Sequence, residues 1–132
     1  MPLITISVVG KRERGYKRAL LDAVHEALVG AGVPAADRFQ RVVELERDNV
    51  MFDPRYPDLA SDRDDDFVLV EVLWSVGRSA NIKRKMARSV VANIAHALGI
   101  NPERVMLVFV ETQWENWAFG GGRLLHADAT AP

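Results

Sequence analysis

The feature of this sequence that most constrains its fold is a strand–helix–strand pattern that occurs twice. The pair Val9-Gly10 recurs as Val76-Gly77, 67 residues later. The pair Gly32-Val33 recurs at the same separation as Gly99-Ile100. Because these pairs mark both ends of the two predicted helices, the constant separation indicates a duplicated β-α-β unit. Each unit joins two parallel strands through a crossover helix. The duplication predicts an α/β (α+β) fold: a four-stranded sheet with both helices on one face.

Hydrophobic periodicity places the elements of this fold. Short segments rich in β-branched and other apolar residues predict strands at residues 2–9, 39–45, 67–76 and 105–111, with room for a short strand near 50–52. Apolar residues at three- and four-residue steps predict two helices. The stripe of the first helix consists of Tyr16, Leu20, Ala23, Val24, Ala27, Leu28 and Ala31. The stripe of the second consists of Ile82, Met86, Val90, Ile94 and Ala97, between an N-cap at Ser79 and a terminating Gly99.

We expect residues 1–132 to form a single domain, because a chain of 132 residues can bury a sizeable core. The two repeat units span about residues 2–45 and 67–111. Loop 46–66, which contains two prolines and an aspartate run, lies between the units, and an irregular tail, 112–132, follows them. The run Asp62–Asp66 lacks the spacing and glycine of a calcium loop, so we interpret it as solvated.

Composition excludes several classes of function. The chain has no cysteine, which rules out a thiol nucleophile, a disulfide framework and cysteine-ligated metal sites. His96 and His126 have no spacing suited to a metal site or a catalytic triad. A net charge of −1 argues against general binding to nucleic acid or an anionic membrane. No apolar run approaches the ~20 residues of a membrane span. We expect a cytoplasmic protein that uses neither a metal nor a cofactor.

The predicted sheet also has a consequence for assembly. If both helices cover one face, the apolar strands at residues 67–76 and 105–111 present the other face uncovered. Soluble monomers rarely expose a large apolar surface. We therefore expect this face to pack against further copies of the chain, most simply in a homotrimer.

Pro2 is a candidate catalyst that no count of side chains detects. Removal of Met1, expected because the next residue is small, leaves Pro2 with a free secondary amine. An α-amino group has a pKa of about 7.7–8.0, and both burial and a nearby cation lower that pKa. A base with a pKa near neutrality suits proton abstraction beside a carbonyl. If Met1 is retained, the nitrogen is an amide and this chemistry is impossible. Many proteins, moreover, begin Met-Pro without using the proline.

Arg78 lies where the strongest predicted strand ends and the second helix begins. Ligands of α/β sheets bind at the carboxyl ends of strands, near helix N-termini. An arginine there can hold a carboxylate through two hydrogen bonds. The alternative interpretation is a surface arginine that caps a turn.

Three segments together resemble the tautomerase superfamily. They are Pro2-Leu3-Ile4, Gly77-Arg78-Ser79-Ala80 and the tail segment Trp117-Ala118-Phe119-Gly120-Gly121-Gly122-Arg123. The segments 20–25 and 33–40 are similar to members of the malonate semialdehyde decarboxylase type, which have the fused, double-length form. The resemblance covers almost the whole chain and is weakest in loop 46–66.

The resemblance implies a role for each matched residue. Pro2 would act as the acid or base, and Arg78 would bind the substrate carboxylate and polarise the carbonyl. Asp37 would be a hydrogen-bond partner or water activator, or else a cap on the approach to its strand. Trp117 and Phe119 would be packing anchors that also shape an apolar pocket wall. His25 matches a family histidine, but its place beside the helix stripe favours a structural or exposed role.

Departures from the family pattern narrow the reaction. The decarboxylases have a second arginine at the position of Val76, and related dehalogenases have one at the position of Ser75. The tail also lacks the glutamate with which dehalogenases activate water. One cation suffices to hold a carboxylate while a proline moves a proton. The sequence therefore predicts a keto–enol tautomerase, an isomerase that acts on a small 2-oxo or enol carboxylic acid such as a 2-hydroxydienoate or phenylenolpyruvate.

Two alternatives stay open at this point. One is a malonate semialdehyde decarboxylase- or hydratase-like lyase. The other is a non-catalytic, ferredoxin-like module that binds a small molecule, because strand–helix–strand twice is also the element order of that fold. Such a module needs no free amine at Pro2. If Pro2 is the catalyst but Arg78 is not the anchor, its repeat mate Lys11, or Arg12, is the next candidate.

Overall fold

The computed structural model describes residues 2–125, so Met1, His126 and the end of the predicted tail lie outside the described residues. Six main elements follow one another in the order strand–helix–strand, strand–helix–strand. They are β1 (Leu3–Val9), α1 (Arg14–Gly30), β2 (Gln40–Leu45), β3 (Val68–Ser75), α2 (Ala80–Leu98) and β4 (Val105–Thr112). Short 3₁₀ turns occupy Arg47–Asn49, Pro102–Arg104 and Trp114–Asn116.

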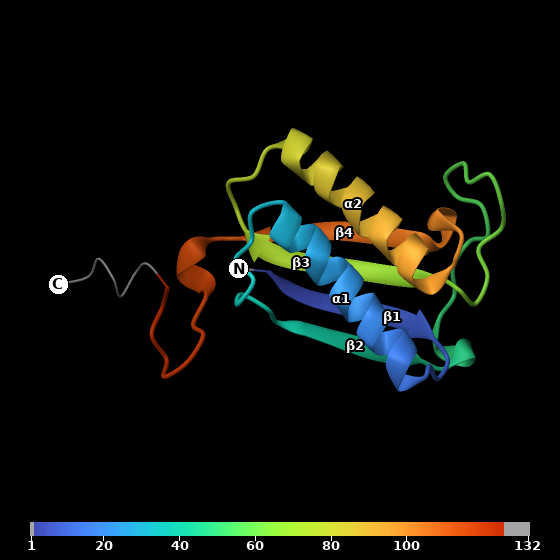
Figure 1. The fold of residues 1–132 in the computed structure, drawn as a ribbon, viewed down its shortest axis with the longest axis horizontal. Coiled ribbons are helices and arrows are strands. Elements are labelled where there is room, and N and C mark those ends of the chain that lie inside the picture. The colour runs from blue at the N-terminus through green and yellow to red at the C-terminus, as the bar shows by residue number, and fades with distance from the viewer. Residues whose placement is uncertain (1, 126–132) are drawn as a thin grey trace.

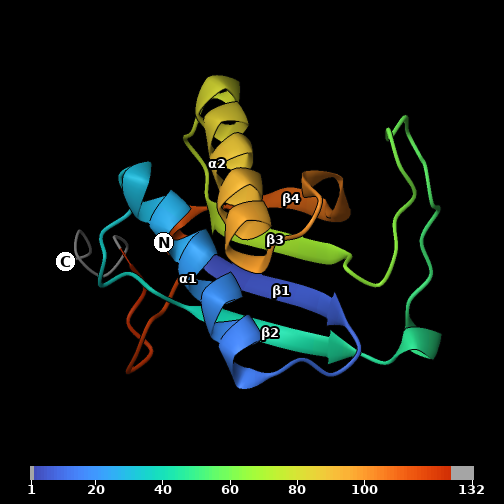
Figure 2. The same ribbon diagram turned by 45° about the vertical axis from the view of Figure 1, so that its right-hand side comes forward.

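The four strands form one mixed sheet with the order β2-β1-β3-β4. Within each repeat unit the strands are parallel, β1 with β2 and β3 with β4. The two units meet through antiparallel pairing of β1 with β3, in which Leu3 lies opposite Leu73. Both helices cover the same face of the sheet (Figure 1; Figure 2). This arrangement confirms the predicted four-stranded sheet with its two helices on one face.

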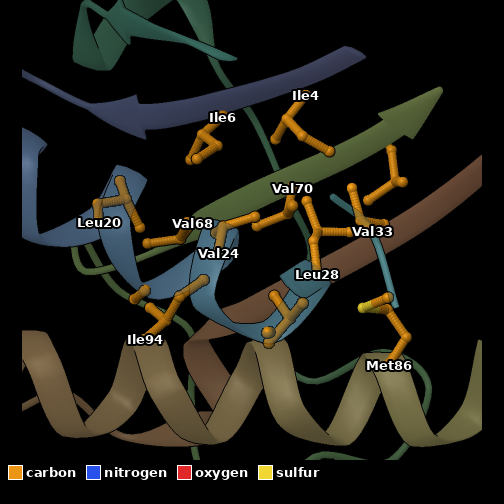
Figure 3. Close-up of a cluster of buried hydrophobic side chains, with 14 of the residues drawn as sticks. Ile4, Ile6, Leu20, Val24, Leu28, Val33, Val68, Val70, Met86 and Ile94 are labelled. Carbon is orange, nitrogen blue, oxygen red and sulfur yellow. The ribbon is translucent and has the colours of Figure 1, made fainter. Parts of the chain in front are cut away.

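The hydrophobic core lies between the sheet and the helices. Alternate strand residues point to this side, so Ile4 and Ile6 of β1 and Val68 and Val70 of β3 are fully buried. Figure 3 shows these side chains directed toward the helices. The helices contribute mainly aliphatic side chains, namely Leu20, Val24, Leu28, Met86, Val90 and Ile94. Burial of each large aliphatic side chain contributes about 1.5–3 kcal/mol.

The ends of α2 form as their sequence predicts. The Ser79 side chain accepts a hydrogen bond from the Ile82 backbone N–H at 3.2 Å, which satisfies one of the free donors of the first turn. Gly99 ends the helix with φ of 65°, a left-handed conformation that favours glycine.

Four details of the sequence interpretation are wrong. Ala31, placed in the stripe of the first helix, is exposed because α1 ends at Gly30 and Ala31 is its C-cap. Residues 50–52 are not a strand; they follow a 3₁₀ turn and no strand pairs with them. Ile82 is 42% exposed because it faces a surface hollow rather than the sheet. Ala97 is also exposed, because the buried stripe continues from Ile94 by four residues to Leu98, which packs against the core.

The other face of the sheet carries no helix. Several of its apolar side chains are substantially exposed, namely Val43, Met106, Val108 and Val110, at 37–49%. We call these four residues the open-face cluster. These exposed side chains confirm that this face of the sheet is uncovered. The predicted trimer would bury them.

Loop 46–66 lies at the end of the sheet opposite the N-terminus (Figure 1; Figure 2). Phe52 of this loop stacks on Phe67, with ring centroids 4.5 Å apart. The aspartate run pairs with arginines: Asp62 with Arg55, and Asp65 with Arg47 at 2.9 Å. The loop therefore does not cover the N-terminal edge. Within residues 2–125, neither helix is long and apolar enough to cross a membrane.

Candidate active site

Three of the predicted site residues converge at one edge of the sheet. Pro2 directly precedes β1, Asp37 lies in the segment that leads to β2, and Arg78 follows β3. Because β1 runs antiparallel to β3, the start of β1 and the end of β3 meet at this edge. Figure 1 shows the N-terminus beside the arrowhead of β3 and below the start of α2.

A hollow of about 300 Å³ opens at this edge and brings Asp37 and Arg78 into one lining. Its walls come from the segment after α1, from the start of α2 and from Trp114 after β4. The remaining lining is largely apolar: Ala31, Gly32, Val33, Pro34, Ile82, Met86 and Trp114. Among these described lining residues, Arg78 supplies the one cation and Asp37 the one carboxylate, which suits a small, weakly polar monoanion.

Arg78 is held by contacts with the end of the preceding strand, β3. Its Nη1 donates a hydrogen bond to the Ser75 carbonyl oxygen at 2.9 Å, and its guanidinium carbon lies 4.1 Å from the centroid of the Trp74 ring. Burial lowers the pKa of the Arg78 guanidinium from its ordinary value, whereas the carboxylates of Glu111 and Asp37 act in the opposite direction. An arginine nevertheless stays protonated at neutral pH. The Arg78 guanidinium is therefore held in place before a ligand binds, and its other N–H groups can donate to that ligand.

Lys83 is the next cation on this end of α2, and it is already paired. Its Nζ lies 2.5 Å from Glu111 Oε1, and both side chains are about 28–29% exposed. This ion pair engages Glu111, and Arg78 is the cation among the described residues that line the hollow.

Pro2 is buried at the start of β1. Leu3 lies opposite Leu73 in the antiparallel register, so continuing that register by one residue brings Pro2 opposite Trp74. On its other side, the Ile4 N–H donates to the Phe39 carbonyl oxygen at 2.9 Å. Pro2 thus lies beside the ring that carries Arg78, although it does not itself line the hollow.

Trp117 and Phe119 do not line the hollow either. Their rings stack with centroids 5.7 Å apart, and Phe119 also contacts Phe39 at 5.3 Å. The segment turns back on itself through a bridge between Ala118 and Leu124. Because the Phe39 carbonyl accepts from the Ile4 N–H, this aromatic cluster lies on the β2 side of Pro2.

His25 has a structural position. It is 8% exposed, and its Nε2 lies 3.0 Å from the Ala35 carbonyl oxygen. Since a carbonyl only accepts, Nε2 carries the proton. This hydrogen bond ties α1 to the segment that carries Asp37, in agreement with the structural interpretation of His25.

The sequence interpretation missed Trp74 as a site residue. It treated Trp74 as part of an apolar strand, yet this residue carries Arg78 and lies opposite Pro2. The available signal was an aromatic residue at the carboxyl end of a buried strand, four positions before an arginine. Three side-chain atoms at this edge are buried without a hydrogen-bond partner among the described residues: Trp74 Nε1, Ser75 Oγ and Trp117 Nε1.

Lys11, the repeat mate of Arg78, lies at the opposite edge of the sheet. It follows the end of β1, which is antiparallel to β3, and its side chain is exposed. Lys11 therefore cannot reach the hollow of its own chain. Over residues 2–125, no group of three or more His, Asp or Glu side chains is arranged to hold a metal ion.

Comparison with known proteins gives consistent matches along the chain. Two family models, each described as "Tautomerase enzyme", match residues 37–120 and 2–59. The probable tautomerase YusQ of Bacillus subtilis (strain 168) is 27% identical over 124 residues, which are 93% of this chain and 96% of that protein.

Solved structures show the same fold. A structure of malonate semialdehyde decarboxylase, from a study of its decarboxylase and hydratase activities, is 31% identical, covers 92% of both chains and has a TM-score of 0.84. A fused 4-OT described as a symmetric trimer is 20% identical over 97% of this chain and 98% of its own, with a TM-score of 0.75.

Proposed function

Because this chain belongs to the tautomerase family, we propose that it is a keto–enol tautomerase acting on a small 2-oxo or enol carboxylic acid. The observation that carries the proposal is that Arg78 and Asp37 line one hollow, at the sheet edge where Pro2 precedes β1. This edge combines a carboxylate-binding cation, a candidate proton carrier and apolar walls.

Arg78 is the proposed anchor of the substrate carboxylate. One of its terminal nitrogens already donates to Ser75, which leaves further N–H donors for a ligand. Arginine can hold a carboxylate with two parallel hydrogen bonds, and partial burial strengthens such charge-assisted bonds. The anchored substrate would extend along the apolar wall of Ile82, Met86 and Trp114.

Pro2 is the proposed proton carrier once Met1 has been removed. Burial and the nearby Arg78 cation both favour the neutral amine, which is the form that acts as a base. The amine takes the hydroxyl proton of the enol, and the resulting ammonium delivers a proton to the adjacent carbon. The C=C bond becomes a C–C bond, the C–O bond becomes C=O, and the amine is regenerated neutral.

Asp37 and the aromatic cluster have supporting roles in this proposal. Asp37 would accept a hydrogen bond from the enol hydroxyl or from a water beside it. Trp117 and Phe119, next to Phe39, would keep water away from the β2 side of Pro2.

The lining of the hollow favours substrates with one carboxylate and an apolar substituent. A second cation for a dianion is absent from the described lining, and the apolar residues there offer contact to an aryl or alkenyl group. We therefore propose aryl- or alkenyl-substituted enolpyruvates, such as phenylenolpyruvate, as the substrate class.

The decisive experiment compares the ketonisation of phenylenolpyruvate by the native protein and by Pro2→Ala. We expect a loss of about 10²-fold or more in kcat/KM, because a primary amine differs in pKa and geometry. Intact mass of the native protein must show Met1 removed. Unchanged turnover by Pro2→Ala, or a native mass that includes Met1, would refute the mechanism and favour a non-catalytic ligand-binding module.

A lyase is the second candidate, and the 31% identity to malonate semialdehyde decarboxylase favours it. Val76 argues against a lyase, because the decarboxylases have a second arginine at this position, in addition to the one matched by Arg78. Assay of the same preparation with malonate semialdehyde distinguishes the two. Carbon dioxide release faster than phenylenolpyruvate ketonisation would replace the tautomerase by a decarboxylase that uses the same Pro2 and Arg78.

We also propose that the chain assembles as a homotrimer through the open-face cluster. The cluster gives an apolar surface that a monomer would expose to water. The fused 4-OT with the same fold forms a symmetric trimer, which makes three copies the natural expectation.

A further inference from the structure

We propose that Trp74 is a positioning residue for Arg78: its indole face holds the guanidinium in place so that the remaining N–H donors meet the substrate carboxylate. The inference rests on the proposed function of Arg78 as the carboxylate anchor. It adds a residue on which that anchoring depends and which acts through Arg78 rather than on the substrate.

Trp74 and Arg78 are in direct contact. Trp74 is fully buried near the end of β3, and the Arg78 guanidinium carbon lies 4.1 Å from its ring centroid. This separation is well within the range of a cation–π interaction, which is strongest with indole. Together with the bond from Nη1 to the Ser75 carbonyl at 2.9 Å, the stack fixes both the plane and the in-plane rotation of the guanidinium.

The Trp74 indole is itself packed against a neighbouring ring. The Phe109 ring of the neighbouring strand β4 stacks on Trp74 with centroids 4.9 Å apart and an interplanar angle of 13°. A buried ring that packs against a neighbouring strand has one available rotamer, so the platform under Arg78 is preorganised. An exposed arginine would instead lose side-chain freedom each time it bound a ligand.

The Trp74 indole also carries an unsatisfied hydrogen-bond donor. Trp74 Nε1 is buried and has no hydrogen-bond partner among residues 2–125. A buried unpaired donor is destabilising, and an aliphatic residue at this strand position would avoid that loss. The ring face toward Arg78 is the property of Trp74 that leucine or isoleucine could not supply.

Trp74 lies next to both proposed reaction groups, Arg78 and Pro2. Leu3 pairs with Leu73, and extending this register by one residue places Pro2 opposite Trp74. The same indole therefore sets the position of the anchor relative to the proton carrier. A displaced guanidinium would shift the substrate along the hollow and away from Pro2.

The test is a double-mutant cycle on carboxylate affinity, measured by calorimetry with the unreactive probe 3-phenylpropanoate. Trp74→Leu removes the ring, and Trp74→Phe keeps a smaller one. We expect Trp74→Leu to weaken binding about tenfold and Trp74→Phe about threefold. In the Arg78→Ala background, both changes should alter affinity by less than about twofold, because the residue through which Trp74 acts is gone.

Ile94→Ala is the matched control, since Ile94 is also fully buried but lies near the far end of α2. It should lose stability comparable to Trp74→Leu while keeping its affinity for 3-phenylpropanoate. A direct readout is the upfield ring-current shift of the Arg78 Hδ protons, which should be present in the native protein and lost in Trp74→Leu.

The outcomes separate the inference from the proposed function. If Arg78→Ala binds the probe as tightly as the native protein, Arg78 is not the anchor and both proposals fail. If Arg78→Ala weakens binding but the Trp74 variants do not, the positioning role alone is wrong. Equal effects of the Trp74 variants with and without Arg78 also overturn it. If Trp74→Leu does not fold, the Trp74→Phe cycle decides.

Discussion

At the scale of single residues, the site depends on how Arg78 is desolvated. Its guanidinium is half-buried, stacked on Trp74 and bonded to a carbonyl of the preceding strand. The carboxylates of Glu111 and Asp37 raise the pKa of this guanidinium, but Glu111 is also paired with Lys83. Positive charge is therefore available to a ligand at a position where water is already partly excluded.

Replacing Arg78 by alanine should raise KM for phenylenolpyruvate about 10- to 100-fold, because the variant loses a charge-assisted pair of hydrogen bonds. The reduction in kcat should be smaller, unless the guanidinium also polarises the carbonyl. Steady-state kinetics separate these two effects. Arg84→Ala is the control, because Arg84 is an exposed arginine of α2 outside the hollow. Equal KM values for Arg78→Ala and the native protein would point to another anchor.

At the scale of elements, the junction between β3 and α2 positions the anchor. Gly77 adopts φ of 120°, which lets the chain leave the strand sharply, and Ser79 then caps the helix. Arg78 lies between these two residues, so its backbone is fixed on both sides. The end of β3 on one side and the N-cap of α2 on the other therefore restrict the backbone of Arg78.

Loss of this cap should lower stability. Ser79→Ala removes the acceptor for the Ile82 N–H and should decrease the free energy of unfolding by about 1 kcal/mol. Urea unfolding at a fixed protein concentration measures the change, since assembly would otherwise contribute. Ser79→Asn restores a side-chain acceptor and should recover most of the loss. A stability loss in the asparagine variant equal to that of alanine would exclude the cap as the cause.

At the scale of the whole molecule, the two ends of the sheet differ although the two β-α-β units are alike. The edge at the start of β1 has Pro2, Asp37, Arg78 and the aromatic cluster. At the other edge β3 begins within the chain after Phe67, so no terminal amine can arise there, and Lys11 is exposed. Each chain therefore has one complete candidate site, and a trimer would have three.

The proposed trimer predicts the effect of a charge on the open face. Val108→Glu should convert a trimer to monomers in sedimentation at micromolar concentration, because a carboxylate in an apolar interface has no partner. Val29→Glu is a matched control, since Val29 is also 38% exposed but lies on the helix side. A native protein that sediments as a monomer, or equal behaviour of the two variants, would contradict assembly through this face.

Much of this architecture follows from sequence pattern alone. Strand and helix periodicities, the Ser79 cap and the Gly99 stop are local properties, set by side-chain spacing and backbone sterics within a few residues. The repeat of 67 residues then determined that the two units are alike and that the sheet has four strands. The candidate residues Pro2, Asp37 and Arg78 were also accessible, since their chemistry and family pattern can be recognised from short segments.

Only the tertiary structure decided how these units meet and what surrounds each group. The antiparallel register of β1 with β3 joins residues about 60 to 70 positions apart, and no local preference encodes it. That register brings Pro2 opposite Trp74 and separates Arg78 from Lys11. Tertiary packing also places Trp74 against Arg78 and places Ile82 in the lining of the hollow rather than in the core. Side-chain identity is a local property, but burial and neighbours arise from packing between distant segments.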